Sequence, residues 1–216
     1  METKPAALTI LFFAAATAVY DALLNPYLPA VIPSHWNING QVDGYSPRIV
    51  LYLSLSPLLP LLLLYVIPSM PSRLLERQSL RATNYMLVAI AAFLFYAGIV
   101  TLQLVLHPGL PEGKFVLTGV LLLLMLLGNV LGKTRRNPWS GIRLPWTLAS
   151  DSNWIATHRM AGRLWVGMSL AGIALLWLGL PMTLLLPAVL LPLVVIPILY
   201  SYLLFRRTQE NGEGPA

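Results

Sequence analysis

Six long runs of apolar residues, separated by polar segments, dominate the sequence. They cover residues 6–24, 49–67, 85–106, 115–131, 164–180 and 182–205. A helix needs roughly 17–25 apolar residues to cross about 30 Å of hydrocarbon, and each run has such a length. Because a strand would leave backbone groups unpaired in lipid, the pattern predicts an all-α, polytopic membrane bundle of about six transmembrane helices.

Composition supports lipid as the medium around these runs. The chain is 57% hydrophobic and only 10% charged, whereas soluble domains carry about 25% charged residues. It contains no cysteine, which excludes disulfides, thiolate catalysis and cysteine-based metal sites.

The basic residues predict the orientation in the membrane. Twelve of the 14 Lys and Arg residues fall at residue 4 and in segments 73–81, 133–163 and 206–207, while the opposite side holds only Arg48 and Lys114. The positive-inside rule therefore predicts that both termini are cytoplasmic. Because topology explains the net charge of +6, we expect no direct binding of nucleic acid.

The first outer loop, residues 25–48, is longer than a simple connector. Its prolines prevent a continuous helix, and Asn39-Gly40 and Asp43-Gly44 provide turn chemistry. We therefore expect an ordered outer cap. Its candidate residues for binding a peptide or cation are His35, Trp36, Asn37, Asp43 and Tyr45. The alternative is that the polar ones hydrogen-bond the turn backbone, and one His with a distant Asp is weak spacing for a metal site.

The inner segment 133–163 is the richest in specific residues. Four N-cap residues at 150–153 predict the start of a helix, which we expect to lie at the interface before the fifth span. On that helix Asp151, Trp154 and His158 share one stripe, with Arg159 and Arg163 on its flank. The candidate residues for an inner partner or ligand are Lys133, Arg135, Asn137, Arg143, Trp146, Asp151, Trp154, His158 and Arg159.

Three interpretations of this helix remain open. Asp151 and His158 would form an acid–base pair, although two helical turns, roughly 10 Å, separate them. Arg159 and Arg163 would hold a phosphate, a lipid headgroup or an acidic partner. The third interpretation is a membrane-surface helix with a hydrogen-bonded histidine.

Ionisable and proline residues within the spans allow a further hypothesis. Asp21 lies near the outer end of the first span, where it is either a proton or cation site or a hydrated group at the interface. Prolines 57, 60, 187, 192 and 197 favour kinks. Together they leave a small transporter or flippase as one alternative function.

Two stretches resemble a known family. The inner one resembles the C-terminal signature of the SdpI family, bacterial immunity proteins against the Sdp peptide toxin. The outer one looks like the N-terminal domain of unknown function that accompanies it. The matching positions of the inner stretch are Gly128-Asn129, Gly132-Lys133, Arg135, Asn137, Gly141-Ile142-Arg143, Pro145-Trp146-Thr147-Leu148, Ser150, Trp154, Thr157-His158-Arg159 and Gly162. Those of the outer stretch are Pro33-Ser34-His35-Trp36-Asn37, Gly40 and Asp43-Gly44-Tyr45.

The resemblance implies a prokaryotic plasma-membrane protein that protects its cell from a membrane-active peptide. In the family's best-known member it also implies signalling through a transcriptional repressor held at the membrane. It transfers no catalytic residues, and we expect no cofactor or metal. The alternative from another class is a membrane enzyme acting on lipid or peptide at the cytoplasmic interface, with Ser150, Asp151 and His158 in its site.

The same features divide the chain. Residues 1–110 form an N-terminal three-helix half with the ordered loop 25–48, and residues 111–207 form an SdpI-like half with the inner segment 133–163. Residues 208–216 are expected to be a disordered tail.

Overall fold

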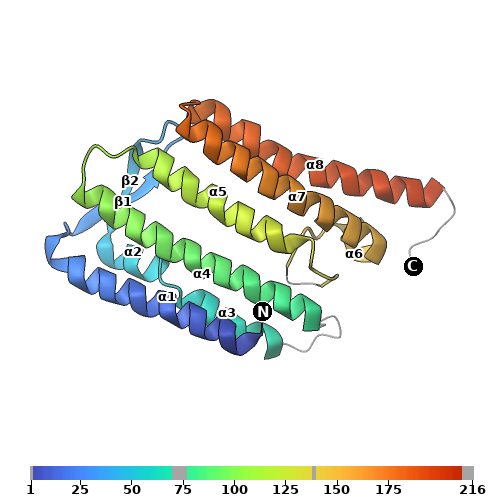
Figure 1. Cartoon of the computed structure of the whole chain (residues 1–216), viewed down its shortest axis with the longest axis horizontal. Helices are drawn as coiled ribbons and strands as arrows, with labels where there is room; N and C mark the ends of the chain where they lie inside the picture. The colour runs from blue at the N-terminus through green and yellow to red at the C-terminus, as the bar shows by residue number, and fades with distance from the viewer. Residues whose placement is uncertain (1, 70–76, 138–139, 211–216) are drawn as a thin grey trace.

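The computed structural model describes residues 2–69, 77–137 and 140–210 and is a bundle of long helices (Figure 1). Its elements are α1 (Thr3–Leu24), a 3₁₀ turn (Asn25–Tyr27), β1 (Val31–Trp36), β2 (Val42–Pro47), α2 (Arg48–Ser54), α3 (Leu58–Ser69), α4 (Arg77–Leu106), α5 (Glu112–Leu131), α6 (Pro145–Ala149), α7 (Asp151–Trp177) and α8 (Met182–Glu210). Within the described residues, six helical segments are long and apolar enough to cross a membrane. The all-α polytopic bundle is therefore confirmed.

Large apolar side chains cover the outside of the bundle. Leu8, Phe12 and Leu191 are 69%, 66% and 60% exposed, and many further leucines and valines of the long helices are exposed as well. Soluble monomers rarely expose apolar patches of such extent. The chain is a multi-pass membrane protein, and these side chains face lipid.

Two groups of helices meet along one interface. Helices α1 and α3 pack on α4, helix α7 packs on both α5 and α8, and α4 packs directly on α5. Each group has its own apolar core. The strands β1 and β2 lie at the end of the bundle opposite the start of α1 and the end of α8 (Figure 1). The first core contains Ala6, Ala7, Ile10, Leu64, Leu87 and Ala91, and the second contains Leu117, Leu121, Leu176, Leu185, Val189 and Leu193.

The second predicted span is two helices rather than one. Helix α2 ends at Ser54 and α3 begins at Leu58, with the buried Pro57 between them. Proline has no N–H to continue a helical ladder and clashes with the preceding turn. In α8, by contrast, Pro187, Pro192 and Pro197 all lie inside a single helix.

The outer loop contains a two-stranded antiparallel hairpin, whereas only turns were predicted there. Strands β1 and β2 pair with Val31 opposite Pro47 and Trp36 opposite Val42, and the register shifts near His35. The turn is closed by Gly40 N–H donating to the Asn37 carbonyl at 2.8 Å. The loop is therefore a small folded unit.

Two helix boundaries differ from expectation. The expected interfacial helix and the fifth span form one continuous helix, α7, so its first turns belong to the bundle. Helix α8 extends to Glu210, three residues into the expected tail, because Thr208 bonds the Leu204 carbonyl and Arg206 pairs with Glu210 at 3.2 Å. The remaining tail, 211–216, lies outside the described residues.

Candidate functional site

The inner segment is built around a stacked pair of rings on α7. Trp154 and His158 lie one helical turn apart, with ring centroids 4.0 Å apart and ring planes at 18°. Ser150 fixes the start of this helix, since its hydroxyl accepts a hydrogen bond from Asn153 N–H. Both rings are fully buried, so the stack is an internal feature of the segment.

Backbone groups hold His158 in one neutral form. Its Nδ1 lies 2.8 Å from the Trp154 carbonyl, and its Nε2 lies 2.8 Å from Ile142 N–H. A carbonyl only accepts and an N–H only donates, so the proton is on Nδ1 and Nε2 is the acceptor. The loop reaches His158 because residue 141 is glycine: its φ is +114°, and a Cβ there would lie 2.4 Å from Nε2.

Other residues of the signature stabilise the same loop. The Asn137 amide donates to the Arg135 carbonyl at 2.7 Å, and its oxygen accepts from Ser140 N–H at 2.8 Å. The buried Thr147 hydroxyl donates to the Ile142 carbonyl at 2.7 Å. Asn137, Trp154 and His158 therefore act by shaping the loop, because their side chains are enclosed.

Trp146 joins the segment to the last helix. Its indole N–H donates to the Ser201 hydroxyl at 2.8 Å, and its ring meets Tyr202 edge-on with centroids 5.4 Å apart. Asn153 donates to the Ser201 carbonyl at 2.9 Å. These contacts fix α6 and the start of α7 against α8.

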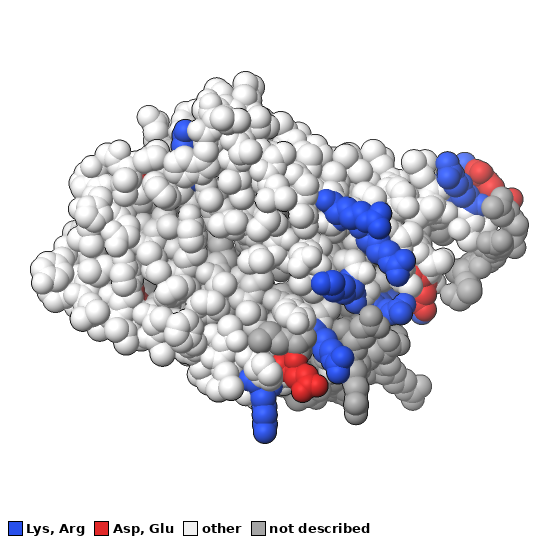
Figure 2. All heavy atoms as spheres, viewed as in Figure 1, with Lys and Arg blue, Asp and Glu red and all other residues white. Residues whose placement is uncertain are grey.

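The remaining inner candidates lie on the surface. Lys133, Arg135, Arg143, Asp151 and Arg159 are all exposed, and basic side chains gather at the end of the molecule that carries the termini (Figure 2).

The residues of the catalytic alternative do not converge. Asp151 forms an ion pair with Arg136 at 2.9 Å, the Ser150 hydroxyl lies 2.9 Å from that of Ser152, and His158 is enclosed. No acid–base pair joins Asp151 to His158.

A groove lies between α5 and α7 beside this segment. It has a volume of about 500 Å³, and the helices touch at its floor, where a Cβ on Gly162 would lie 2.6 Å from the Gly128 carbonyl oxygen. Its lining residues are Gly128, Asn129, Gly132, Lys133, Arg159, Gly162, Arg163, Val166 and Gly167. The spacing Gly128-x-x-x-Gly132 is the sequence signal for such a close helix contact.

On the outer face, the polar candidates bond within the hairpin. His35 Nδ1 lies 2.5 Å from an Asp43 carboxylate oxygen, with the side chains 70% and 43% exposed. The Asn37 side-chain oxygen accepts from the backbone N–H groups of Asn39 and Gln41 at 2.9 and 3.1 Å. Tyr45 is exposed. Among the described residues no three His, Asp or Glu side chains form a group suited to a metal ion.

The hairpin also contacts the C-terminal helices. The Trp36 indole donates to the Glu112 carboxylate at 2.9 Å. At the tip, Gly40 has a φ of +77°, and a Cβ there would lie 3.0 Å from Gly113 Cα and 2.9 Å from Met182 Sδ. The outer cap therefore bridges the two helix groups.

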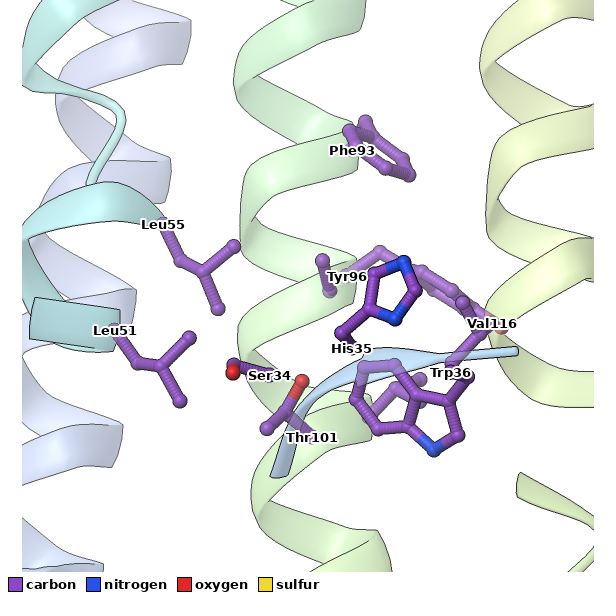
Figure 3. Close-up of a pocket in the computed structure, with 11 residues that line it drawn as sticks. Ser34, His35, Trp36, Leu51, Leu55, Phe93, Tyr96, Thr101 and Val116 are labelled. Atoms are coloured by element: carbon purple, nitrogen blue, oxygen red, sulfur yellow. The ribbon is translucent and has the colours of Figure 1, made fainter. Parts of the chain in front are cut away.

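Beneath β1 lies an apolar pocket of about 280 Å³. Leu51 of α2 and Leu55, the residue after that helix, project toward Tyr96 and Thr101 of α4 (Figure 3). Its lining residues are Ser34, His35, Trp36, Leu51, Leu55, Phe93, Tyr96, Ala97, Val100, Thr101 and Val116. The α4 residues could not be singled out from the sequence, because inside an apolar run nothing distinguishes a pocket wall from a lipid-facing side chain.

Comparison with known proteins assigns the two regions separately. Residues 133–201 match the SdpI/YfhL protein family, and residues 12–60 match a domain of unknown function (DUF1648). No curated protein and no solved structure matches the chain. The two matches confirm the resemblance found in the sequence, with the stacked rings in the first region and the outer hairpin in the second.

Proposed function

We propose that this chain, with its SdpI/YfhL segment behind a DUF1648 segment, is an immunity protein of the prokaryotic plasma membrane that protects its cell from a membrane-active peptide. The observation that carries the proposal is the apolar pocket beneath β1. It lies at the outer end of the bundle, where such a peptide arrives. The hairpin above it is bonded to α5 through Trp36 and Glu112.

The chemistry of the pocket suits an apolar side chain of a peptide. Trp36, Phe93 and Tyr96 provide aromatic walls, and the hydroxyl groups of Ser34 and Thr101 lie among the lining residues. Burying one large apolar side chain stabilises a complex by roughly 1.5–3 kcal/mol. The hydroxyls supply hydrogen-bond partners for the peptide backbone.

Protection by this route needs no covalent step. A peptide held at the outer end of the bundle is removed from the pool that assembles into pores. The bound and free populations then follow mass action. The proposal accordingly assigns no residue to catalysis.

The test is survival of toxin-sensitive bacteria that express the chain and are challenged with an Sdp-class peptide. Ala97→Phe places a ring inside the pocket and is expected to abolish protection. Ala15→Phe adds the same ring on an exposed position of α1 and is expected to protect as the parent does. Both variants must reach the membrane in equal amounts. Full protection by Ala97→Phe would remove the pocket from the mechanism.

A second candidate function is recruitment of a cytoplasmic transcriptional repressor. What favours it is the enclosed ring stack, which supports a loop whose arginines 135 and 143 face outward at the inner end. We expect an Arg135→Ala/Arg143→Ala variant to release a fluorescently tagged repressor from the membrane of toxin-treated cells while survival is kept. Unchanged membrane localisation would argue against this surface.

A further inference from the structure

Three cations rim the groove between α5 and α7. Lys133, Arg159 and Arg163 are all exposed and all line it. Within the described residues, the ion pairs to carboxylates involve His35, Arg81, Arg136 and Arg206, and none involves these three. The groove therefore concentrates positive charge that the described protein does not neutralise.

The depth of these cations in the membrane makes a counter-ion important. Arg159 and Arg163 precede Trp177, at the outer end of α7, by 18 and 14 residues, or about 27 and 21 Å of helix. With Trp177 at the outer interface, Arg159 lies near the inner edge of a hydrocarbon core about 30 Å thick, and Arg163 lies about one helical turn deeper. An unpaired charge at that depth is costly, so an anion beside it is strongly favoured.

The shape of the groove matches an amphiphile. Lys133 and Asn129 lie at its inner end, and Val166 and Gly167 continue it along α7 toward the hydrocarbon. No side chain fills this far end, because residue 167 is glycine and nothing lies within 4 Å of where its Cβ would be. One end is thus cationic and the other open and apolar.

We propose that this groove binds an anionic phospholipid of the inner leaflet, with the headgroup phosphate between Lys133, Arg159 and Arg163 and an acyl chain along Val166 and Gly167. Arginine presents a fork of donors that suits phosphate oxygens. A cationic rim favours an anionic lipid over a zwitterionic one. The inference does not depend on immunity to a peptide.

The test uses the purified full chain, incubated with phosphatidylglycerol or phosphatidylcholine and examined by native mass spectrometry. The parent chain is expected to retain phosphatidylglycerol in preference to phosphatidylcholine. A Lys133→Gln/Arg159→Gln/Arg163→Gln variant is expected to retain at least about tenfold less, which corresponds to the loss of one charge-assisted contact or more.

A matched control removes the same charge elsewhere. Lys4→Gln/Arg206→Gln/Arg207→Gln also deletes three exposed basic side chains near the inner end but leaves the groove intact. It is expected to retain the lipid as the parent does. Equal loss in the two triple variants would show a general charge effect and overturn the specific site.

A steric variant tests whether a lipid chain occupies the groove, even if the triple variant fails to fold. Gly167→Leu keeps every charge, introduces no protein clash at its Cβ and fills the apolar end of the groove. It is expected to lower retention severalfold, whereas Ala174→Leu, an exposed position further along α7, has no effect. Unchanged binding by Gly167→Leu, or displacement of the lipid by excess inorganic phosphate, would show that no lipid chain occupies the groove.

Discussion

The Trp36 indole of the outer hairpin donates a hydrogen bond of 2.9 Å to the Glu112 carboxylate in the first turn of α5. The two residues are 76 positions apart. Trp36 lies in the DUF1648 match, and Glu112 lies between the two matched regions. Because Trp36 also lines the outer pocket, one side chain contacts both the proposed peptide site and the C-terminal helices. A change in the pocket therefore has a direct route to α5.

Replacing Trp36 with phenylalanine is expected to loosen the hairpin while keeping an aromatic ring in the pocket. The change removes one hydrogen bond, worth about 1 kcal/mol. The tip amides, such as Gly40 N–H, should then exchange with deuterium roughly fivefold faster. Hydrogen-exchange mass spectrometry of the chain in nanodiscs measures this.

Tyr45→Phe is the control for that experiment, because Tyr45 is 64% exposed on the same hairpin. It also removes a single aromatic hydrogen-bonding group. We expect its exchange to match the parent. Equal acceleration in the two variants would mean that the contact with Glu112 does not hold the cap.

The number and positions of the spans could be predicted from the sequence because, in lipid, the backbone N–H and C=O groups have to bond to each other. An apolar run long enough to cross the hydrocarbon has to be helical there, and six such helices are present in the described part of the chain. The break in the second span was less predictable. Of the prolines inside the predicted spans, the sequence does not distinguish Pro57, which lies in the break between α2 and α3, from Pro192, around which α8 continues.

The hairpin and the ring stack show where sequence reasoning reached its limit. Asn39-Gly40 between Trp36 and Val42 is a hairpin signal, but Pro33 and Pro47 inside the strands obscured it. For the inner segment, the sequence places Trp154 and His158 on one stripe of a helix, and their rings stack on α7. The sequence left open whether this stripe is covered, because helical periodicity identifies a face and only the approach of Gly141 shows what lies against it.

The enclosed position of His158 separates its role from that of Arg143. His158→Ala leaves Ile142 N–H without its acceptor and opens a cavity beside Trp154, so we expect a loss of about 3 kcal/mol in unfolding free energy. Arg143→Ala, at an exposed position, is expected to change the unfolding free energy by about 1 kcal/mol or less. Thermal unfolding in detergent measures both. A destabilisation by Arg143→Ala as large as that by His158→Ala would contradict this assignment.

The energetic cost of the contact between residue 141 and His158 can be separated from the cost of the backbone conformation by comparison with a second glycine. Gly141 and Gly109 have φ values of +114° and +104°, but a Cβ at 141 would lie 2.4 Å from His158 Nε2, whereas one at 109 meets nothing within 4 Å. Gly109→Ala should therefore cost about 1–2 kcal/mol from the backbone alone. Gly141→Ala should cost about 3 kcal/mol or more, as measured by thermal unfolding.

The His158→Ala background tests the steric part of that difference. With the imidazole removed, the cost of Gly141→Ala should fall toward that of Gly109→Ala, because the coupled residues no longer collide. The same cost in both backgrounds would place the clash elsewhere, for instance at Trp154, whose ring lies 3.0 Å from the added Cβ.

Helices α5 and α7 approach each other at Gly162, and this contact forms the floor of the groove between them, which Lys133, Arg159 and Arg163 line. A Cβ on Gly162 would lie 2.6 Å from the Gly128 carbonyl oxygen, so Gly162→Ala has to push two backbones apart and is expected to cost about 1–3 kcal/mol. Gly167→Ala lies in open space on the same helix and should stabilise by up to about 1 kcal/mol through helix propensity. Thermal unfolding of the two variants in detergent measures whether each substitution lowers or raises the stability of the chain. If Gly162→Ala were as stable as Gly167→Ala, the helices would not be in backbone contact, and the groove would not have the floor on which the lipid site depends.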